Sequence, residues 1–495
     1  MDGAQSTQQK RTPLPKLQVF ILLFIQFAEP VTALVIYPFI MQFIRDIGIT
    51  GGDESKTGYF AGIIESVFFL AECLTVVWFG RASDRYGRRP VLLFGPLGLC
   101  LSMLGFGFSK HFWSLVVFRC IQGAFNGNIG VAKSVMAEIS DSTNIAEIYS
   151  LLPFMWTVGV TVGPLIGGTF ADPATTFPDT LGKLSLFREY PYLLPCALAG
   201  TLAFLAFVFG FFGLKEARFL SAFACLPCLI QAQTLPSAIA KQNKARQGTE
   251  TEPLLADREA SASSASSESE GETIIDREPP PLRDLFTRPV VIALTNHAFL
   301  CFCQMSFDVL NPLVYATPID MGGLGLTPFS IGRIMGTVGF LNVFTQTLLS
   351  AKLIRRFGPR AIFHTTFILL PIAFLAYPFL NYFARKAGKV DAAVIAVMAV
   401  QLSASFAIFP TYACTQIFIV DSAPTQNSLG GVNGLAQMVS SILRSVAPTL
   451  AASLFATSVS HNLLGGNLVF FVLCGLSLCG LRATFLLPTQ LRSEN

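Results

Sequence analysis

The stretch Gly80–Pro90, which reads GRASDRYGRRP, decides the fold, because it places five charges in eleven residues between two long apolar segments. Lipid does not accommodate such charges, so the sequence predicts a short loop at a membrane surface. Four of the charges are arginines, and this basic bias favours the cytoplasmic side. The glycines allow a tight turn and a close helix contact. Asp84 is suited to accept hydrogen bonds from a helix N-terminus or to pair with an arginine.

The composition is that of a polytopic membrane protein. Of 495 residues, 52% are hydrophobic and only 13% are charged, and the mean hydropathy is +0.58. These values exclude an ordinary soluble domain. The net charge of +4 is small, and no basic run with interleaved aromatic residues suggests nucleic-acid binding. Most of the eleven cysteines lie in apolar stretches, where they are interpreted as packing residues.

Apolar segments of about 20 residues recur along the chain, which predicts an all-α membrane protein with twelve transmembrane helices. Lysine and arginine predominate on the side of both termini, so both are expected in the cytoplasm. The expected domains are tails at 1–16 and 489–495, six-helix halves at 17–214 and 289–488, and a disordered cytoplasmic linker at 215–288. Spans are expected near 17–44, 58–80, 91–108, 113–137, 147–171, 190–214, 289–317, 328–350, 361–380, 391–420, 429–457 and 466–488.

The two halves echo one another. The stretch AKLIRRFGPR at 351–360 matches the first loop in its Arg-aromatic-Gly core, although Ala351 and Arg355 stand where the first copy has Gly80 and Asp84. Likewise, Val-Gly-Pro at 162–164 corresponds to Val-Ala-Pro at 446–448. A decayed internal repeat of six spans is typical of secondary transporters.

The pattern Gly-x-x-x-Asp-Arg-x-Gly-Arg-Arg resembles the loop between spans two and three of the major facilitator superfamily. The resemblance implies two six-helix pseudo-repeats and a latch for the outward-facing state, in which Asp84 docks near the start of span eleven and Arg88 reaches Glu138. The alternative is a basic turn that only fixes topology. The latch residues are Gly80, Asp84, Arg85, Gly87, Arg88, Arg89 and Glu138.

Span four carries a polar stripe at helical spacing, which should face a cavity or a partner helix. Its members are Arg119, Gln122, Asn126, Gly130 and Lys133. The Arg-x-x-Gln-Gly core resembles the family's fourth-span motif, which is linked there to proton coupling. The alternative is that Arg119 only pairs with a nearby carboxylate.

Span five combines small residues with a proline, a pattern that lets helices approach closely. It resembles the "antiporter" motif of drug:proton antiporters, which implies export. The alternative is ordinary small-residue packing. The motif residues are Gly159, Gly163, Pro164, Gly167 and Gly168.

Four acids within predicted spans are candidate proton carriers, because a low-dielectric medium favours the neutral form of an acid. Asp308 and Glu29 are the preferred candidates, Glu72 comes next, and Glu65 is last. A carboxyl group that alternates between protonated and ion-paired states can couple a proton gradient to conformation. The alternative is that each is a satisfied structural acid.

Polar faces in several spans predict a substrate cavity. Arg444 lies near mid-membrane, where a cation needs a partner, and either Asp308 or an anionic group of a substrate would supply one. The candidate cavity residues are Gln26, Gln122, Asn126, His297, Gln304, Asn311, Tyr412, Gln437 and Arg444.

These features favour a proton-coupled exporter of a small organic molecule, a drug or secondary metabolite, that works by alternating access. A metal-homeostasis carrier for zinc or a metal chelate is the alternative. Residues 427–437 resemble span eleven of zinc-induced-facilitator-like carriers, but the cysteine of that group's first loop is missing from 45–57. A non-transporting receptor would not need the loop motif. No nucleotide loop or nucleophile elbow suggests an enzyme.

The expected partners are a small-molecule substrate, protons and the lipid bilayer. No cofactor, metal site or nucleic acid is expected, and the protein is expected to be a monomer. The plasma membrane is the expected location. Residues 250–255 resemble an acidic dileucine signal, so the vacuolar membrane stays open as an alternative.

Overall fold

The computed structural model describes residues 16–138, 145–214, 285–424 and 428–488. Within these ranges all regular elements are helical and no strand occurs. In this part of the chain, eight helices are long and apolar enough to cross a membrane, and two shorter apolar helices accompany them. The prediction of an all-helical membrane fold is confirmed, whereas the number of spans and their orientation remain predictions. The linker up to residue 284, with its dileucine-like segment, lies outside the described residues.

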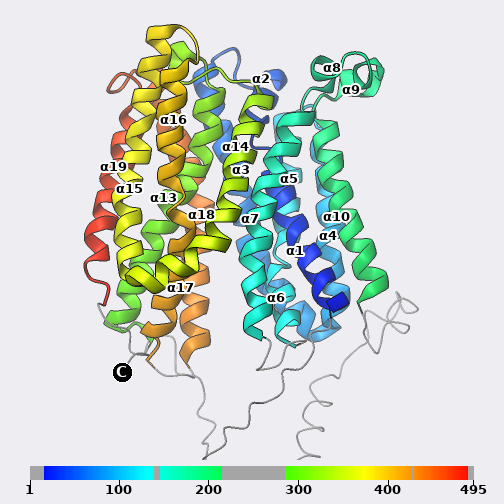
Figure 1. Cartoon of the computed structure of the whole chain (residues 1–495). Coiled ribbons are helices and arrows are strands. Elements are labelled where there is room, and N and C mark those ends of the chain that lie inside the picture. Colours follow the sequence, from blue (N-terminus) through cyan, green and yellow to red (C-terminus); the bar gives the residue numbers. More distant parts are fainter. Residues whose placement is uncertain (1–15, 139–144, 215–284, 425–427, 489–495) are drawn as a thin grey trace, which may run out of the picture. The chain divides into compact units, whose positions relative to one another are not determined.

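The first half of the chain forms one group of packed helices, coloured blue to green in Figure 1. Within it, α4 packs on α10, α3 packs on α5, and α1 lies against both α7 and α10. The elements are α1 (Lys16–Leu34), α2 (Ile40–Ile47), α3 (Thr57–Tyr86), α4 (Arg88–Gly107), α5 (Phe112–Asn126), α6 (Ile129–Glu138), α7 (Ile145–Phe170), α8 (Pro173–Thr176), α9 (Ser185–Glu189) and α10 (Leu193–Gly213).

The second half forms a corresponding group, in which α13 packs on α18, and α15 packs on α16, α17 and α19. A π-helix at Thr345–Ser350 joins α14 to α15. The helices are α13 (Arg288–Ala316), α14 (Pro328–Phe344), α15 (Ala351–Ala387), α16 (Ala392–Ser405), α17 (Ile408–Ser422), α18 (Leu429–Ser460) and α19 (Leu468–Thr484).

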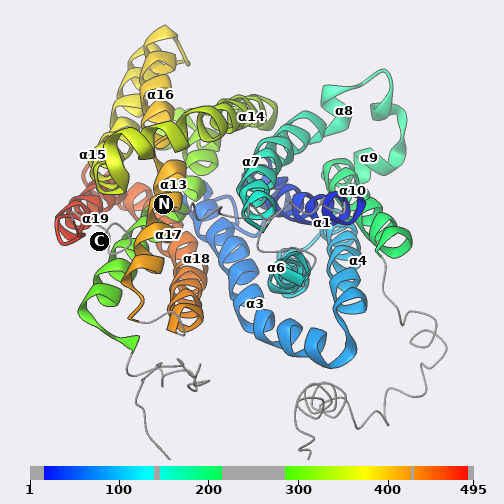
Figure 2. The same ribbon diagram turned by 60° about the horizontal axis from the view of Figure 1, so that its bottom comes forward.

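Two helix pairs join the halves: α3 packs on α18, and α7 packs on α14 (Figure 2). Small residues bring these helices together. A Cβ atom on Gly62 would lie 2.9 Å from the Cβ of Ala452, and one on Gly168 would lie 2.6 Å from the Cα of Gly332. Thr449 adds hydrogen bonds from its hydroxyl to the Gly62 carbonyl (3.1 Å) and to Ser66 Oγ (2.7 Å).

The basic motif is more helical than the predicted loop. Helix α3 continues to Tyr86 and α4 begins at Arg88, so a single residue, Gly87, makes the turn at φ +99°. The charges therefore lie on helix ends. Gly80 has no atom within 4 Å of the place where a Cβ would be, so the close helix contact expected there is absent in this conformation. The second copy is similar, with Gly358 at φ +78° as the break within α15.

Span four is broken, so its polar stripe does not follow one continuous helix. The Thr75 hydroxyl donates to the carbonyl of Ala124 (2.8 Å), the acceptor that the Asn128 amide would use in an unbroken α-helix. The backbone N–H of Asn128 instead contacts the Phe125 carbonyl at 3.4 Å. The backbone of α3 comes so close that a Cβ on Gly127 would lie 2.9 Å from the Val76 nitrogen.

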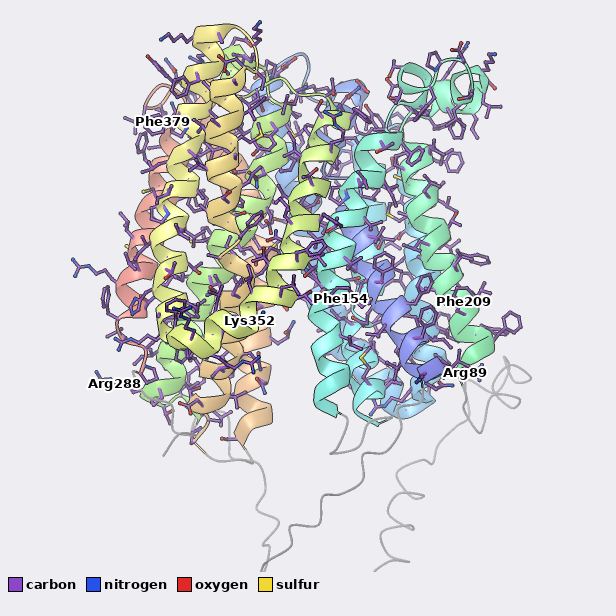
Figure 3. All side chains as sticks on the ribbon, viewed as in Figure 1. Arg89, Phe154, Phe209, Arg288, Lys352 and Phe379 are labelled. Atoms are coloured by element: carbon purple, nitrogen blue, oxygen red, sulfur yellow. The ribbon has the colours of Figure 1, made fainter. Side chains whose placement is uncertain are left out.

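Spans one and ten are interrupted as well, at residues 35–39 and 406–407. Pro410 explains the second break, because it has no N–H to donate to the carbonyl of Phe406. Large apolar side chains cover the outside of the helices, as a lipid-facing surface requires; Phe209 and Phe379 are 45% and 58% exposed (Figure 3). Arg89 and Arg288 lie toward the same end of the helices (Figure 3).

Candidate functional site: two polar networks and a cavity

The first polar network surrounds Arg119, which is 1% exposed. Its Nη2 lies 2.8 Å from Glu65 Oε1 and donates to the Ala33 carbonyl at 3.0 Å, while Nη1 donates to Gln122 Oε1 at 2.8 Å. The guanidinium carbon also lies 4.3 Å from the centre of the Phe68 ring. Helices α1, α3 and α5 are thereby joined around one buried cation. The carboxylate partner that the sequence left open is Glu65.

Tyr37 extends this network toward the second half of the chain. Its hydroxyl donates to Glu65 Oε2 at 3.1 Å, and the tyrosine also interacts electrostatically with Asp308 on α13. Tyr37 was not predicted, because a tyrosine in an apolar stretch carries no signal; it lies in the interruption between α1 and α2. The two carboxyl groups therefore act on one phenol, Glu65 through a hydrogen bond and Asp308 through its charge.

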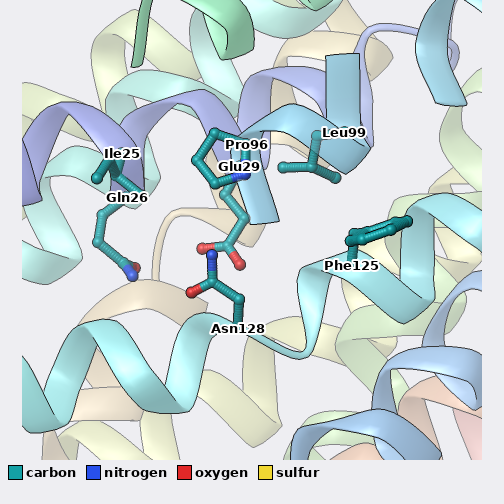
Figure 4. A pocket seen from close by; sticks show the side chains of 7 residues that line it. All are labelled: Ile25, Gln26, Glu29, Pro96, Leu99, Phe125 and Asn128. Carbon is teal, nitrogen blue, oxygen red and sulfur yellow. The ribbon is translucent and has the colours of Figure 1, made fainter. Parts of the chain in front are cut away.

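Glu29 belongs to a separate small pocket within the first half. Figure 4 shows its carboxylate facing the amide of Asn128, with Gln26 nearby. The pocket encloses about 220 Å³ of empty space. The Asn128 amide also donates to the Leu92 carbonyl at 2.9 Å. The residues that line the pocket are Ile25, Gln26, Glu29, Pro96, Leu99, Phe125 and Asn128.

Glu72 lies two helical turns from Glu65 on α3, as the sequence predicts, but the two acids bind different partners. Glu72 accepts a hydrogen bond from the Asn126 side chain at 3.0 Å. Gln122, the other predicted polar residue of α5, donates to the Thr32 carbonyl at 2.9 Å and is almost fully buried. These residues of α5 therefore bind protein groups in this conformation.

A second cavity lies against α13 and spans about 620 Å³, including space that is open to the surroundings. Val160 of α7 contributes from the first half, and the rest of the lining comes from α13, α14, α16 and α17. Its polar lining includes Gln304, Asp308, Asn311, Tyr315, Asn342 and Ser405. Three predicted residues, Gln304, Asp308 and Asn311, are thus brought together.

Two buried tyrosines hold the polar wall of this cavity. The Tyr315 hydroxyl donates to Gln401 Oε1 at 3.0 Å, and the Tyr377 hydroxyl donates to Asn311 Oδ1 at 2.6 Å. Tyr377 was not predicted, since it lies in an apolar stretch of α15 without charged neighbours. Phe307, Met335 and Phe409 supply apolar surface. The cavity therefore offers both polar groups and hydrophobic contact, as small-molecule sites generally do.

The second polar network surrounds Cys301 on α13. His297 Nε2 lies 2.6 Å from Ser440 Oγ, the Tyr412 hydroxyl donates to Cys301 Sγ at 3.6 Å, and Ser440 Oγ lies 3.4 Å from the same sulfur. The Arg444 guanidinium interacts electrostatically with Tyr412 and Cys301. Helices α13, α17 and α18 meet at this cluster, which we call the Cys301 cluster.

One of the two alternatives for Arg444, a salt bridge with Asp308, is not formed in the described conformation. In the part of the chain that the structure describes, no carboxylate oxygen lies within 4.0 Å of the Arg444 guanidinium. Arg444 interacts electrostatically with both Asp308 and Cys301, without a direct contact to the carboxylate. Gln437, another predicted cavity residue, is exposed on α18.

The glycines of the predicted antiporter motif lie where backbones meet. A Cβ on Gly159 would lie 2.3 Å from the Pro30 ring, and one on Gly167 would lie 1.9 Å from the Val35 carbonyl oxygen. Gly163 faces the same helix, at 3.0 Å from the Val31 carbonyl, whereas Gly168 contacts α14. The motif therefore packs α7 on α1 and α14, as the packing alternative expected; its role in transport direction stays a prediction.

The latch residues are only partly described. Arg88 Nη1 donates to Ser83 Oγ at 2.8 Å, and the Arg89 guanidinium donates to the Phe211 carbonyl. Arg85 is exposed and lies over the Tyr86 ring at 5.6 Å. The side chains of Asp84 and Glu138 lie outside the described residues, so the latch remains a prediction.

Two groups of packed membrane helices, with buried acids and a polar cavity, define a membrane transporter architecture. The sequence matches the Major Facilitator Superfamily over residues 19–448. The chain therefore belongs to this family: it is a multi-pass membrane transporter and not an enzyme.

Its relatives include efflux proteins. The chain is 33% identical to the major facilitator-type transporter psiT2 of Psilocybe cyanescens, covering 97% of this chain and 92% of that protein. It is 27% identical to the multidrug transporter mfsB of Aspergillus fumigatus, covering 93% of this chain and 81% of that protein. Among solved structures, a D-xylose–proton symporter shares the fold with a TM-score of 0.66 at 14% identity, covering 96% and 98% of the two chains.

Proposed function

We propose that this protein is a proton-coupled exporter of a small organic molecule, either a drug or a secondary metabolite. Its similarity to a multidrug transporter supports the class of substrate, and its similarity to an efflux pump supports the direction. The amphipathic lining of the α13 cavity supports an organic molecule over a bare ion. Export would proceed by alternating access, with the two halves rocking about the substrate.

The observation that carries proton coupling is the position of Asp308. This half-buried acid lines the cavity, and its charge acts on Tyr37, whose hydroxyl binds Glu65. A proton on Asp308 would change the field at Tyr37. A proton on Glu65 would weaken its ion pair with Arg119, because the Coulomb attraction of that pair needs a charged carboxylate. Both acids thus have a route by which protonation changes helix contacts.

We propose that the described conformation is one of the two access states. The contacts between halves that join α3 to α18 involve Gly62, Ser66, Thr449 and Ala452. Gly80, near the other end of α3, faces open space. In the alternate state, the first set of contacts would separate and the Gly80 end of α3 would approach α18, where Asp84 and Arg88 would act as the latch.

The twelve spans, with both termini in the cytoplasm, are also part of this proposal, as are the monomeric state and the plasma-membrane location. Arg89 and Arg288 lie toward the same end of the helices, which supports a cytoplasmic location of that end, because basic residues favour the cytoplasmic side. Accessibility of engineered tags at each terminus in intact and permeabilised cells tests it.

The first experiment is a growth screen. The chain is expressed in a yeast strain without its own exporters, and growth on toxic organic compounds is compared with growth at high and low zinc. Resistance to organic compounds is expected. A zinc phenotype without organic resistance would favour the metal-homeostasis alternative instead.

The second experiment tests coupling. In sealed vesicles with an imposed proton gradient, Asp308→Asn is expected to lower gradient-driven transport of an organic compound found in the screen at least tenfold, because an amide cannot carry the proton. Exchange of the compound without a gradient should persist. Asp320→Asn, at an exposed acid beyond α13, serves as the control. Full gradient-driven transport by Asp308→Asn would remove this residue from the mechanism.

A further inference from the structure

The two arginines in the polar networks, Arg119 and Arg444, differ in whether a carboxylate pairs with them. Arg119 has a carboxylate at 2.8 Å, two further oxygen acceptors and an aromatic ring. Arg444 has no salt bridge among the described residues, and the Nε of both arginines is buried without an acceptor. A cation in the interior of a membrane protein is costly unless an anion or water balances it. The first network contains a paired carboxylate, whereas the second has none in salt-bridge range.

The described groups around Arg444 do not include a protein carboxylate that pairs with its guanidinium. Two acids act on it, Glu72 of α3 and Asp308 of α13, and both lie outside salt-bridge range. Glu72 already accepts a hydrogen bond from Asn126. The Tyr412 hydroxyl beside the guanidinium donates to Cys301 Sγ, and His297 and Ser440 share a 2.6 Å hydrogen bond nearby. The Cys301 cluster is therefore polar but places no carboxylate in contact with Arg444.

The cluster also neighbours the α13 cavity along the helix. Gln304 follows Cys301 by one turn of α13, about 4.5 Å along the axis, and its side chain lines the cavity together with Phe307. A molecule with an anionic group at Arg444 would therefore extend its hydrophobic part toward Phe307, Met335 and Phe409. A guanidinium is well suited to carboxylate and phosphate, which it binds through two parallel N–H···O bonds.

We propose that Arg444, with Tyr412, binds the carboxylate or phosphate group of an amphipathic organic substrate. This inference rests on the proposed export function and names the chemical class of its substrate. The same guanidinium repels an inorganic cation, so this site disfavours a bare metal ion as cargo.

The test measures binding to the purified full-length protein in detergent by equilibrium dialysis. The probes share one ring system: 2-naphthoate, 2-naphthyl phosphate and the uncharged 2-naphthamide. The wild-type protein is expected to bind at least one anion tenfold or more tightly than the amide. The tighter of the two anions identifies the group that the site prefers.

Variants assign the preference to Arg444. Arg444→Gln is expected to reduce it to less than twofold while leaving the amide affinity unchanged, which also shows that the variant is folded. Arg444→Lys should retain an intermediate preference, because it keeps the charge without the planar fork. Arg482→Gln, which removes an exposed arginine near the end of α19, should retain the full preference. Equal wild-type affinity for anion and amide, absence of anion binding, or a preference that survives in Arg444→Gln would overturn the inference.

The outcome separates this inference from the proposed function. If gradient-driven export of organic compounds is found but the anion preference is not, the inference fails and the export function stands. If the anion preference is found but no gradient drives transport of the anion in vesicles, the proton-coupled function fails and the binding site stands.

Discussion

At the scale of single residues, the buried pair of Arg119 and Glu65 combines structural and functional demands. The pair is nearly inaccessible to solvent, so neither charge has water to replace its partner. Breaking such a pair by removing one charge typically costs about 3–5 kcal/mol, whereas replacing both charges with apolar groups is often nearly neutral. This asymmetry gives a way to separate stability from coupling.

We expect Glu65→Leu and Arg119→Leu each to lower the apparent unfolding temperature of the detergent-purified protein by several degrees. The double variant should lose much less than the sum of the two, because no unpaired charge remains. Differential scanning fluorimetry measures all three, and gradient-driven transport by the double variant then reports on coupling. Additive losses in the double variant would contradict the role of the pair as one buried unit.

Residues with charge were predictable as candidates, but their partners were not. Arg119, Glu65, Asp308 and Arg444 stand out because charged residues are rare in apolar stretches. Arg119 pairs with Glu65 instead of another acid because of how α3 and α5 face one another. The packing of two helices cannot be predicted from local patterns in a single sequence. Asp308 and Arg444 interact without forming a salt bridge, and this too depends on how α13 and α18 pack.

At the scale of elements, hydropathy located the membrane helices, and side-chain chemistry explains where they break. The interruption of span ten follows from Pro410, which was visible in the sequence. At the interruption of span four, the Thr75 hydroxyl of α3 lies 2.8 Å from the Ala124 carbonyl. That contact is between residues 49 positions apart, so no local pattern predicts it. The basic loop contracted to Gly87 because charged residues are compatible with helix ends at a membrane surface.

The segment that carries α8 and α9 offers a test at this scale, because an exposed ion pair ties it to the residues before α5. Lys110 Nζ pairs with Glu189 at the end of α9. The hydrogen bond from Lys110 lowers the pKa of Glu189, and the bond to Glu189 raises the pKa of Lys110. A carboxyl group with a lowered folded-state pKa contributes stability that is present above its unfolded value, near 4.5, and is lost as pH falls through the folded value.

We therefore expect limited proteolysis within residues 171–192 to accelerate as the pH falls below about 4.5. An acid-active protease applied to the purified protein measures the rate. The Glu189→Gln variant should be cleaved at one rate throughout this pH range, because its side-chain amide does not titrate. Added salt should reduce the wild-type pH dependence, since the pair is exposed and screened. A wild-type rate independent of pH would show that this pair does not hold the segment.

At the scale of the whole molecule, alternating access requires that contacts between the two halves form and break in turn. The contact at Gly62 and Ala452 is one of the closest between α3 and α18. Because the side chain at 62 is absent, the two backbones approach until a Cβ on Gly62 would lie 2.9 Å from that of Ala452. Disulfides ordinarily need a Cβ–Cβ distance of about 3.5–4.5 Å, so a cysteine pair requires a slight separation of the helices there.

We expect a Gly62→Cys/Ala452→Cys pair, placed in a variant without the native cysteines, to cross-link under mild oxidation and to stop transport. Reduction should restore transport, because the block is the covalent tie between the halves and not damage to the site. Cross-linking is followed by gel shift after protease cleavage in the linker, and transport is measured in the same vesicles. Each single cysteine variant, treated with the same oxidant, controls for side reactions. Undiminished transport by fully cross-linked protein would mean that α3 and α18 remain in contact throughout the cycle, and the separation of these helices would have to be abandoned as the access step.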